Sequence, residues 1–570
     1  MPAALAWLTK MLLDGVGNPA VALADQLPVV LGLGLLGIVA ALTPHGSTYV
    51  AARLQRRISL IMQRELYGSV NRIDGISAFE SPRFLDRLNL AQQAAVMAPT
   101  QVSSAFFGLL QTFVMGASFV VVLVVINPLI VVVALVAAVP GLMVQLAAGK
   151  REANMMWRMS PRARRQMFYQ MLMLDSQAAK EIRLFGLGAF FAGRMQQETE
   201  QIHRAEDEVD RRILYSNAPL ALLGALIAGA GLLWIIRQAA RGNQSVGDVA
   251  AFVASVSGLQ MAVGDAVRTA VRVQGSLLMF AHYDEITGFR PETGSHLDLI
   301  RAAEPRPIRR LARGIEFRNV GYRYEGDDRW ALRNVSFDVP AGSSIALVGE
   351  NGAGKSTLVK LLCRFYDPTV GAILWDGVDV REFDVAELRD RVSVVFQDYM
   401  CYDLSASDNI GLGDLARRGE HGEIVSAANQ AGLHSTLDEL PLGYETMLSR
   451  TFFQGVEDGS AGVTMSGGQW QRIAIARALF RADRNLLILD EPSAGLDATA
   501  EQAIHDRLAE YRGRLTSVLI THRLGAVKNA SSIIVLDDGS VVECGTHEEL
   551  LARRGKYSQL FTTQAAKYTG

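Results

Sequence analysis

A glycine-rich segment near the middle of the chain has the residue types and the spacing that can hold a phosphate chain. It fits the pattern G-x-x-x-x-G-K-[ST] and consists of Gly349, Glu350, Asn351, Gly352, Ala353, Gly354, Lys355 and Ser356, with Thr357 next. The apolar stretch 344–348 predicts a strand before it, and the spacing over 357–366 predicts a helix after it. Glycines let backbone N–H groups close around phosphate oxygens, and a helix N-terminus adds positive potential. The sequence therefore predicts an ATP-binding loop in which Lys355 meets the β- and γ-phosphates and Ser356 holds Mg²⁺.

Two neighbouring carboxylates follow a second buried strand. Residues 486–489 are four consecutive aliphatic residues, which is typical of a central strand, and Asp490 and Glu491 come directly after them. Burying two carboxylates is costly unless something uses them. We expect Asp490 to hold Mg²⁺, usually through water, and Glu491 to orient and deprotonate the water that attacks the γ-phosphate. A carboxylate pair that only caps the next turn is the alternative, and the phosphate loop upstream argues against it.

A third segment could also meet an anion. It follows Met465, stands before a helical stretch, and consists of Ser466, Gly467, Gly468 and Gln469. A hydroxyl and unpaired N–H groups at a helix start can bind a phosphate, but an ordinary N-cap at Ser466 has the same sequence. Because the chain already has one phosphate loop, these residues alone leave the role of the segment open.

The first half of the chain has the composition of a membrane domain. Five stretches are long and apolar enough to cross a bilayer as helices, which takes about 20 residues; they lie near 27–45, 104–126, 129–147, 218–236 and 247–266. Only Asn127 and Pro128 separate the second stretch from the third, so these two should form a tight hairpin. His45 is a candidate for a water-filled cavity, whereas Asp265, Arg268 and Arg272 should anchor the last helix at the inner surface.

Basic residues orient these spans. The stretch 52–100 holds seven Arg and the stretch 149–215 holds twelve Lys or Arg, whereas the turns at 126–129 and 237–247 hold almost none. By the positive-inside rule, both long loops and the chain after the last span are cytoplasmic. Five spans would then put Met1 outside, although residues 1–26 do not resemble a signal peptide. We therefore expect the apolar stretch 2–13 to belong to a first, truncated helix and the intact molecule to have six transmembrane helices.

The overall composition agrees with a membrane protein that carries a polar domain. The chain has 570 residues, of which 49% are hydrophobic and only 20% are charged, and its net charge is -2. These values exclude a disordered chain and a small secreted scaffold, and they leave no basic field for nucleic acid. The three cysteines, Cys363, Cys401 and Cys544, lie far apart in the polar half, which fits a reducing compartment rather than a disulfide or zinc site.

The fold class follows from these segments. Prolines 291, 305 and 307 and three following arginines predict an exposed linker over 288–313, and strands and helices alternate from 314 onward. The sequence therefore predicts a multi-domain chain. An all-α transmembrane bundle occupies 1–287 and an α/β P-loop ATPase domain occupies 314–570.

Together these motifs resemble the ATP-binding cassette of ABC transporters. The order of membrane half and ATPase half is similar to that of fused half-transporters with the type IV exporter fold. The resemblance implies that the signature segment of one cassette completes the ATP site of another, so that Ser466, Gly467, Gly468 and Gln469 touch the γ-phosphate held by Lys355 of a second chain. It also implies adenine stacking by Tyr324, Mg²⁺ sensing by Gln397, a D-loop at Asp497 and a γ-phosphate contact by His522.

Other segments fit the same resemblance with a few departures. Residues 77–86 and 176–185 resemble the two coupling helices that dock on cassettes. Met465 and Gly495 stand where Leu and Ala are common, and the loop 455–462 lacks the usual acidic residue before its last glycine. The last departure puts the signalling between this loop and the coupling helices in question.

The resemblance implies an ATP hydrolase coupled to export across the cytoplasmic membrane, with ATP and Mg²⁺ bound by the cassette. The substrate would be a lipophilic small molecule, a peptide or a lipid. The partners of the protein would be membrane lipids and a second half-transporter chain, identical or related. Nucleic acid would not be a partner. An importer built on the exporter fold and a regulatory membrane ATPase are the alternatives, and the spans argue against a soluble ATPase.

Overall fold

The computed structural model describes residues 2–16, 23–126, 128, 131, 151, 155, 159, 161–175, 178–242, 244–288, 304–449, 462–481, 484–492 and 515–569. Its contacts divide the chain into two units. The first contains Met1–Arg72 and Arg83–Phe289, and the second contains Ile73–Pro82 and Arg290–Gly570. A ten-residue segment between two helices of the first unit thus belongs to the second, which departs from the sequence-based boundary at 287.

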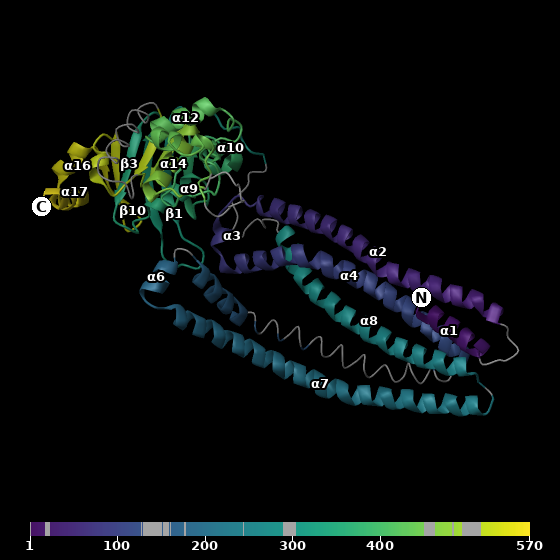
Figure 1. The fold of residues 1–570 in the computed structure, drawn as a ribbon. Helices are drawn as coiled ribbons and strands as arrows, with labels where there is room; N and C mark the ends of the chain where they lie inside the picture. The colour runs from purple at the N-terminus through teal and green to yellow at the C-terminus, as the bar shows by residue number, and fades with distance from the viewer. Residues whose placement is uncertain are drawn as a thin grey trace. The chain divides into compact units, whose positions relative to one another are not determined.

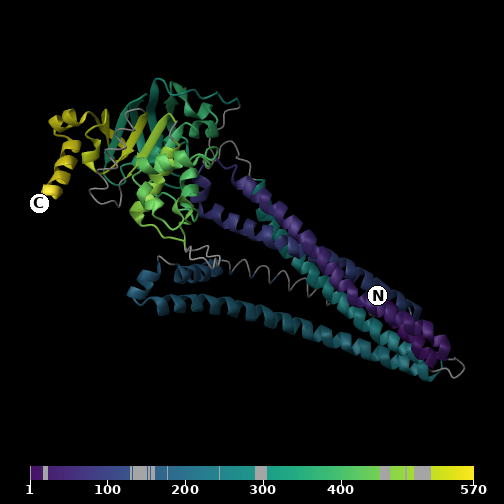
Figure 2. The ribbon, with the colours of Figure 1, turned by 45° about the horizontal axis from the view of Figure 1, so that its top comes forward.

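The first unit is helical. Figures 1 and 2 show α2, α4 and α8 lying lengthwise beside one another, and α1 packs against α2 and α8. Helices of this unit include α1 (Pro2–Val16), α2 (Leu23–Val70), α4 (Pro82–Ile126), α6 (Ala178–Leu184), α7 (Gly188–Ala240) and α8 (Val246–Thr287), and residues 161–174 are helical as well. The helical N-terminal bundle is therefore confirmed.

These helices are longer than the apolar stretches that predicted them. Four contain segments able to cross a membrane: Gln26–Val70, Pro82–Ile126, Leu222–Ala240 and Val246–Ala270. At 1.5 Å per residue, α2 and α7 extend over about 70–80 Å, more than twice a hydrocarbon core of about 30 Å. Much of the two predicted cytoplasmic loops is thus helix that continues past the membrane. The predicted span 129–147 lies outside the described residues apart from Val131.

One end of the helical unit is fixed by apolar packing and by ion pairs. Residues of α1, α4, α7 and α8 share a buried cluster that includes Ala6, Leu123, Ile235 and Phe252. Next to it, the Lys10 ammonium lies 3.0 Å from Asp14 Oδ2 and 3.2 Å from Asp248 Oδ1. Asp14 also accepts a hydrogen bond from Gly247 N, 2.9 Å away, so α1 is joined to the first turn of α8.

Of the charged residues predicted within the spans, His45 and Arg268 are exposed and Asp265 is partly exposed in this chain. His45 is exposed in the first half of α2. Asp265 and Arg268 pair across one turn of α8 at 2.6 Å, and the side chain of Arg272 lies outside the description. The hypothesis of a cavity at His45 stays a prediction.

The second unit contains two sheets. A four-stranded antiparallel sheet has the order β2-β1-β4-β5, and a six-stranded sheet has the order β10-β9-β3-β8-β7-β6, parallel except at β10. The strands are β1 (Gly314–Tyr322), β2 (Leu332–Pro340), β3 (Ser344–Gly349), β4 (Val370–Trp375), β5 (Val378–Asp379), β6 (Val392–Val395), β7 (Leu486–Asp490), β8 (Thr516–Ile520), β9 (Ser532–Asp537) and β10 (Ser540–Gly545). The α/β class of this domain is confirmed.

Short helices complete this unit. The longer ones are α9 (Lys355–Leu362), α12 (His421–Gln430), α14 (Gly467–Phe480) and α17 (Lys556–Thr569). The others are α3 (Ser77–Glu80), α10 (Val385–Arg389), α11 (Ala406–Gly411), α13 (His434–Asp438), α16 (His547–Arg553) and the 3-10 turns η1 (Val380–Glu382), η2 (Gly443–Glu445) and η3 (Leu524–Val527).

The six-stranded sheet is covered on both faces. Side chains that alternate along its strands pack into two separate cores, one on each face. Ala346 and Val348 of β3 pack in the core that contains the signature helix α14. Ile345 and Leu347 face the opposite core, which contains α9 and the four-stranded sheet. Because side chains alternate along a strand, this pattern places α9 and α14 in separate layers. Every residue of β7 and β8 is buried, as a central parallel strand requires.

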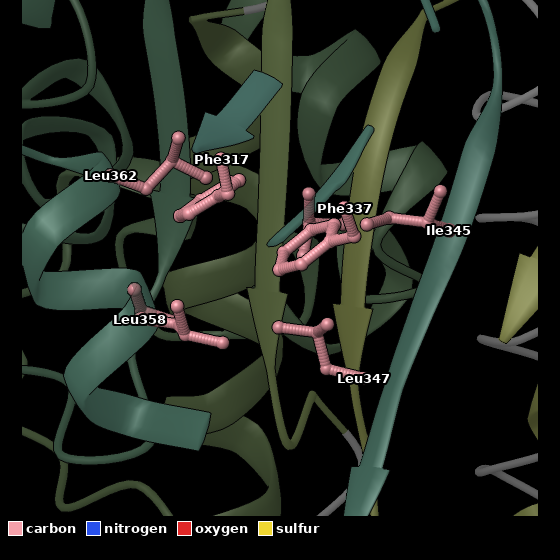
Figure 3. A pocket seen from close by; sticks show the side chains of 8 residues that line it. Phe317, Phe337, Ile345, Leu347, Leu358 and Leu362 are labelled. Atoms are coloured by element: carbon pink, nitrogen blue, oxygen red, sulfur yellow. The ribbon is translucent and has the colours of Figure 1, made fainter. Parts of the chain in front are cut away.

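Apolar contacts hold α9 between the two sheets. Figure 3 shows Phe317, Phe337, Leu358 and Leu362 around a small apolar cavity. The two rings stack with centroids 4.3 Å apart, and Leu358 of α9 is 1% exposed. Burying one such leucine contributes about 1.5–3 kcal/mol, so the position of α9 is strongly determined.

The predicted linker is only partly exposed. Its residues 289–303 lie outside the description, but Ile308 is buried in the core around α9. The backbone N–H groups of Ala312, Arg313 and Gly314 donate to the Asp376 carboxylate. Residues 304–313 therefore pack against the second unit.

Candidate nucleotide-binding site

The phosphate loop and four other predicted site residues, Gln397, Asp490, Glu491 and His522, meet at one edge of the six-stranded sheet. The phosphate loop follows β3, His522 follows β8, Asp490 and Glu491 end β7, and Gln397 follows β6. These four strands are parallel neighbours in the order β3-β8-β7-β6. Their carboxyl ends therefore lie side by side, which is where open α/β sheets bind ligands. Residues far apart in the sequence are brought together by this topology.

Two glycines give the phosphate loop its path. Gly352 has φ 84° and Gly354 has φ 97°, both in the left-handed region that side chains disfavour. A Cβ on Gly354 would also lie 2.6 Å from Leu332 Cδ2. Gly354 is the N-cap of α9 and supplies no side-chain cap, so the first N–H groups of α9 can turn to a ligand. This geometry fits a phosphate chain.

The Lys355 ammonium lies inside the same loop. It donates to the carbonyl oxygens of Gly349 and Glu350, each 2.8 Å away, and the residue is 7% exposed. Burial lowers the pKa of Lys355, although the carboxylates of Glu491 and Asp490 oppose the shift. Phosphate oxygens would replace the two carbonyls as stronger, charge-assisted acceptors.

Asp490 is a buried carboxylate on the phosphate-loop side of the sheet. It is 5% exposed and follows Leu486 and Ile488, which face the α9 core. Burial raises the pKa of Asp490 to about 6, and the neighbouring Glu491 adds to the rise. The Lys355 charge and a hydrogen bond from Ser356 pull in the opposite direction. A buried carboxylate with so weak a counter-charge is suited to a cation.

Three residues fix the position of Glu491. Its Oε2 accepts from Gln397 Nε2 at 3.1 Å, and its Oε1 lies 3.2 Å from His522 Nδ1. Its carbonyl oxygen accepts from Gln471 Nε2 at 3.1 Å. The backbone of Glu491 has φ 50°, a left-handed conformation that costs free energy in a residue with a side chain. The carboxylate is thus held at a defined point on the sheet edge, between Gln397 and His522.

Tyr324 packs beside α9. Its hydroxyl lies 3.1 Å from Thr357 Oγ1, which joins it to the helix that begins at the phosphate loop. Its ring packs edge-on against Tyr322 and Tyr366, and the Lys360 ammonium lies 5.7 Å from its centroid. The half-buried ring is therefore held on three sides, as a platform for a flat base requires.

The first coupling segment contacts this aromatic cluster. Glu80 of α3 accepts hydrogen bonds from Tyr366 and, at 2.9 Å, from Lys360 Nζ. Burial alone would raise the pKa of Glu80, but these two hydrogen bonds outweigh it and lower the pKa. Arg389 Nη2 also donates to the carbonyl oxygen of Asp74, 2.7 Å away. The predicted segment 77–86 is not one helix, because α3 ends at Glu80 and α4 starts at Pro82.

The signature segment begins α14 on the opposite side of the sheet. Ser466 and Gln469 form a capping box, in which Ser466 Oγ accepts from Gln469 N and Gln469 Oε1 accepts from Ser466 N. The N-cap reading is thus correct for this chain, and a hydroxyl that accepts one bond can still donate to a phosphate. Ser466 and Gly467 are exposed. The layer that holds them is separated from α9 by the sheet.

Some predicted residues lie outside the description, and some contacts were not predicted. Asp497 and most of the loop 455–462 are not among the described residues, nor are Ser176 and Gln177 before α6. Sequence reasoning assigned no role to Gln471, which is 1% exposed. Because positions i and i+2 of a helix lie on different faces, Gln471 points away from the side that carries Gln469. This spacing was the signal in the sequence that Gln471 belongs to a different environment from Gln469. Glu80 lies in the predicted coupling segment 77–86, but its partners Lys360 and Tyr366 had no signal in the sequence.

Comparisons with known proteins concern the ATPase domain and the fold of the chain. The sequence model of the family described as "ABC transporter" matches residues 332–494. A solved structure described as a bacterial Atm1-family ABC exporter with ATP bound superposes with a TM-score of 0.82 and 23% identity, covering 99% of this chain and 96% of that one. This likeness shows that the two chains share a fold.

Two curated relatives carry the same description, ATP-dependent lipid A-core flippase. That of Alkalilimnicola ehrlichii is 34% identical over 385 residues, which cover 67% of this chain and 62% of the relative. That of Escherichia coli K12 is 42% identical over 259 residues, which cover 45% of this chain and 42% of the relative. The chain thus spans between about two fifths and three fifths of the length of these relatives.

The matched domain, the 34% identical relative and the shared fold together support an ABC half-transporter of the exporter fold. Its second unit contains the ATP-binding domain of that family. It is a multi-pass membrane protein with a cytoplasmic ATPase domain.

Proposed function

We propose that this chain hydrolyses ATP at the sheet edge and uses the cycle to export a lipophilic substrate across the cytoplasmic membrane. The observation that carries the proposal is the Glu491 carboxylate, held by Gln397 and His522 beside the phosphate loop. A carboxylate fixed in this way can orient a water and accept its proton as the water attacks the γ-phosphate. Lys355 and the first N–H groups of α9 bind the phosphates, and Tyr324 stacks on the base.

The remaining proposed roles follow from the same geometry. Mg²⁺ would be held by Ser356 and Asp490, with Gln397 nearby, because oxygen donors are its preferred ligands. Among the described residues no group of three acidic, His or Cys side chains could hold a metal. Phosphate and water oxygens would complete the Mg²⁺ shell. When bound, Mg²⁺ neutralises charge on the phosphate oxygens. Ser466–Gln469 of a second chain, identical or related, would complete the site, with Asp497 beside it.

A lipid or another lipophilic molecule is the substrate that the helical unit supports best. Large apolar side chains such as Leu35, Leu42, Phe113 and Leu226 are exposed along α2, α4 and α7 of the single chain. Such surfaces suit lipid and apolar ligands rather than strongly charged ones. The two curated relatives are described as flippases of a lipid, which supports the same class.

The proposal is tested with Glu491→Gln, which keeps the shape of the side chain but removes the base. We expect the purified chain to bind ATP with unchanged affinity and to lose about 10²–10⁴-fold in kcat. Glu387→Gln, at an exposed position of α10, is the matched control and should hydrolyse ATP normally. Normal hydrolysis by Glu491→Gln would refute the assigned base.

Direction and substrate class need a membrane assay. In inside-out vesicles, an exporter accumulates a fluorescent lipid or lipophilic dye inside in an ATP-dependent manner, and Glu491→Gln should abolish this accumulation. Depletion of the probe from such vesicles would indicate import. A regulatory ATPase would be favoured if lipids did not stimulate ATP hydrolysis and the probe did not move across the membrane.

A further inference from the structure

The last described helix, α17, is fixed at its start to the core of the ATPase unit. The Glu543 carboxylate on β10 accepts from the backbone N–H groups of Lys556 and Tyr557, at 2.6 and 3.0 Å. Tyr557 is 0% exposed, and its hydroxyl lies 2.7 Å from His547 Nδ1. A helix with a capped first turn and a buried tyrosine has a defined direction.

About two turns later, α17 reaches the segment that carries His522. Gln564 Nε2 donates to the carbonyl oxygen of His522 over 2.7 Å. The Lys528 ammonium, just after η3, lies 5.5 Å from the centroid of Phe561. The helix therefore contacts this segment on both sides of η3. Gln564 bonds to the main-chain carbonyl of His522 and not to its side chain. The imidazole of His522 therefore still contacts Glu491.

A second contact of α17 reaches the phosphate loop but contributes little. The Lys556 ammonium lies 3.0 Å from Glu350 Oε1 and 3.4 Å from Asp537 Oδ2. Both Lys556 and Glu350 are solvent-exposed enough that water and salt screen the pair. The Gln564 bond is short, 2.7 Å, and it meets the carbonyl of His522 itself, so it is the contact of α17 with consequences for the site.

We propose that Gln564 is a positioning residue for ATP hydrolysis, which acts by fixing the main chain of His522 so that the imidazole meets Glu491. The inference rests on the proposed function, because it assigns a role within that site. Gln564 touches no nucleotide itself. Loss of its donor should loosen His522, and the effect should fall on the chemical step rather than on ATP binding.

The test uses four variants of the full-length chain. Gln564→Glu keeps the size but replaces the donor with a charge that faces the carbonyl, and Gln564→Leu removes the donor. Gln564→Lys restores a donor on a long side chain, and Thr563→Ala is the control at the neighbouring exposed position. For each, kcat and KM for ATP are measured per nucleotide-binding site, counted with a fluorescent ATP analogue, so that unfolded protein does not contribute.

We expect Gln564→Glu and Gln564→Leu to lower kcat about fivefold, which corresponds to about 1 kcal/mol. KM should stay unchanged, Gln564→Lys should recover most of the rate, and Thr563→Ala should resemble the unchanged chain. Wild-type kcat in Gln564→Glu, a change confined to KM, or no recovery in Gln564→Lys would each overturn the inference. Glu491→Gln separates the two hypotheses: if it is inactive while Gln564→Glu is normal, the proposed function stands and only the role of Gln564 falls.

Discussion

At the residue scale, Asp490 combines the metal-binding role proposed above with a raised pKa. Because the pKa is about 6, the carboxylate is ionised at pH 7.5 and mostly protonated at pH 5.5. Protons and Mg²⁺ therefore compete for it in that range. From one group that titrates near pH 6, we expect the free Mg²⁺ needed for half-maximal ATP hydrolysis to rise about fourfold between pH 7.5 and 5.5.

The measurement is a Mg²⁺ titration of ATPase activity at each pH, corrected for Mg²⁺ binding to ATP in protein-free buffer. An unchanged Mg²⁺ requirement would contradict the role of Asp490. A rise in pH favours Mg²⁺ binding at Asp490, but it lowers the stability of the metal-free fold. Since folding raises this pKa, the native state holds the proton more tightly, and Asp490 destabilises the metal-free fold above pH 6 but not at pH values below its unfolded pKa.

Local motifs made most of the site predictable, and contacts between distant segments did not. The glycine spacing of 349–356 and the aliphatic run 486–489 each require a particular backbone, and the structure has β3, α9 and β7 there. By contrast, Gln471, Glu80 and Gln564 are ordinary polar residues in sequence. Their contacts arise only when the sheet order brings their elements together.

The same distinction explains the lengths of the elements. Hydropathy marks where a helix leaves the membrane but does not mark where the helix ends, so the predicted spans stop well before α2 and α7 do. Composition also predicted an exposed linker at Pro305 and Pro307. It could not predict that Ile308 enters the core around α9, because a single apolar residue between prolines carries no periodic pattern.

At the element scale, α3 should influence nucleotide binding through Glu80. The carboxylate holds Lys360 and Tyr366, which in turn pack around Tyr324. Glu80→Ala leaves the Lys360 ammonium without this acceptor, so the ring of Tyr324 loses one of its supports. Because the pair is partly exposed, the expected effect is small, a rise of about threefold in the ATP concentration for half-saturation, with kcat little changed.

ATP titrations of hydrolysis check this expectation, with Glu387→Ala on α10 as the control carboxylate. Glu80→Gln should lie between Glu80→Ala and the unchanged chain, because an amide still accepts hydrogen bonds from Tyr366 and Lys360. Equal half-saturation in Glu80→Ala and the control would show that the coupling segment does not act on the base platform.

At the scale of the whole molecule, the layering of the ATPase unit argues for a site shared by two chains. The phosphate loop leads into α9 on one side of the sheet, and Ser466 starts α14 on the other. One chain therefore cannot readily offer both segments to the same phosphate. In a two-fold dimer, each phosphate loop can face the signature segment of the other chain, which produces two equivalent sites.

Mixing two inactive variants tests this arrangement. Lys355→Ala removes the phosphate contact but keeps the signature, and Ser466→Arg blocks the signature but keeps the phosphate loop. Each variant alone should be inactive. Co-expressed with different tags, half of the dimers are mixed and each has one intact site, so we expect about a quarter of the wild-type ATPase rate if the two sites act independently. If each chain formed its whole site alone, every site in the mixture would carry one defect and no activity would appear, whereas recovered activity in tandem-purified mixed dimers requires that Ser466 serves the Lys355 of its neighbour.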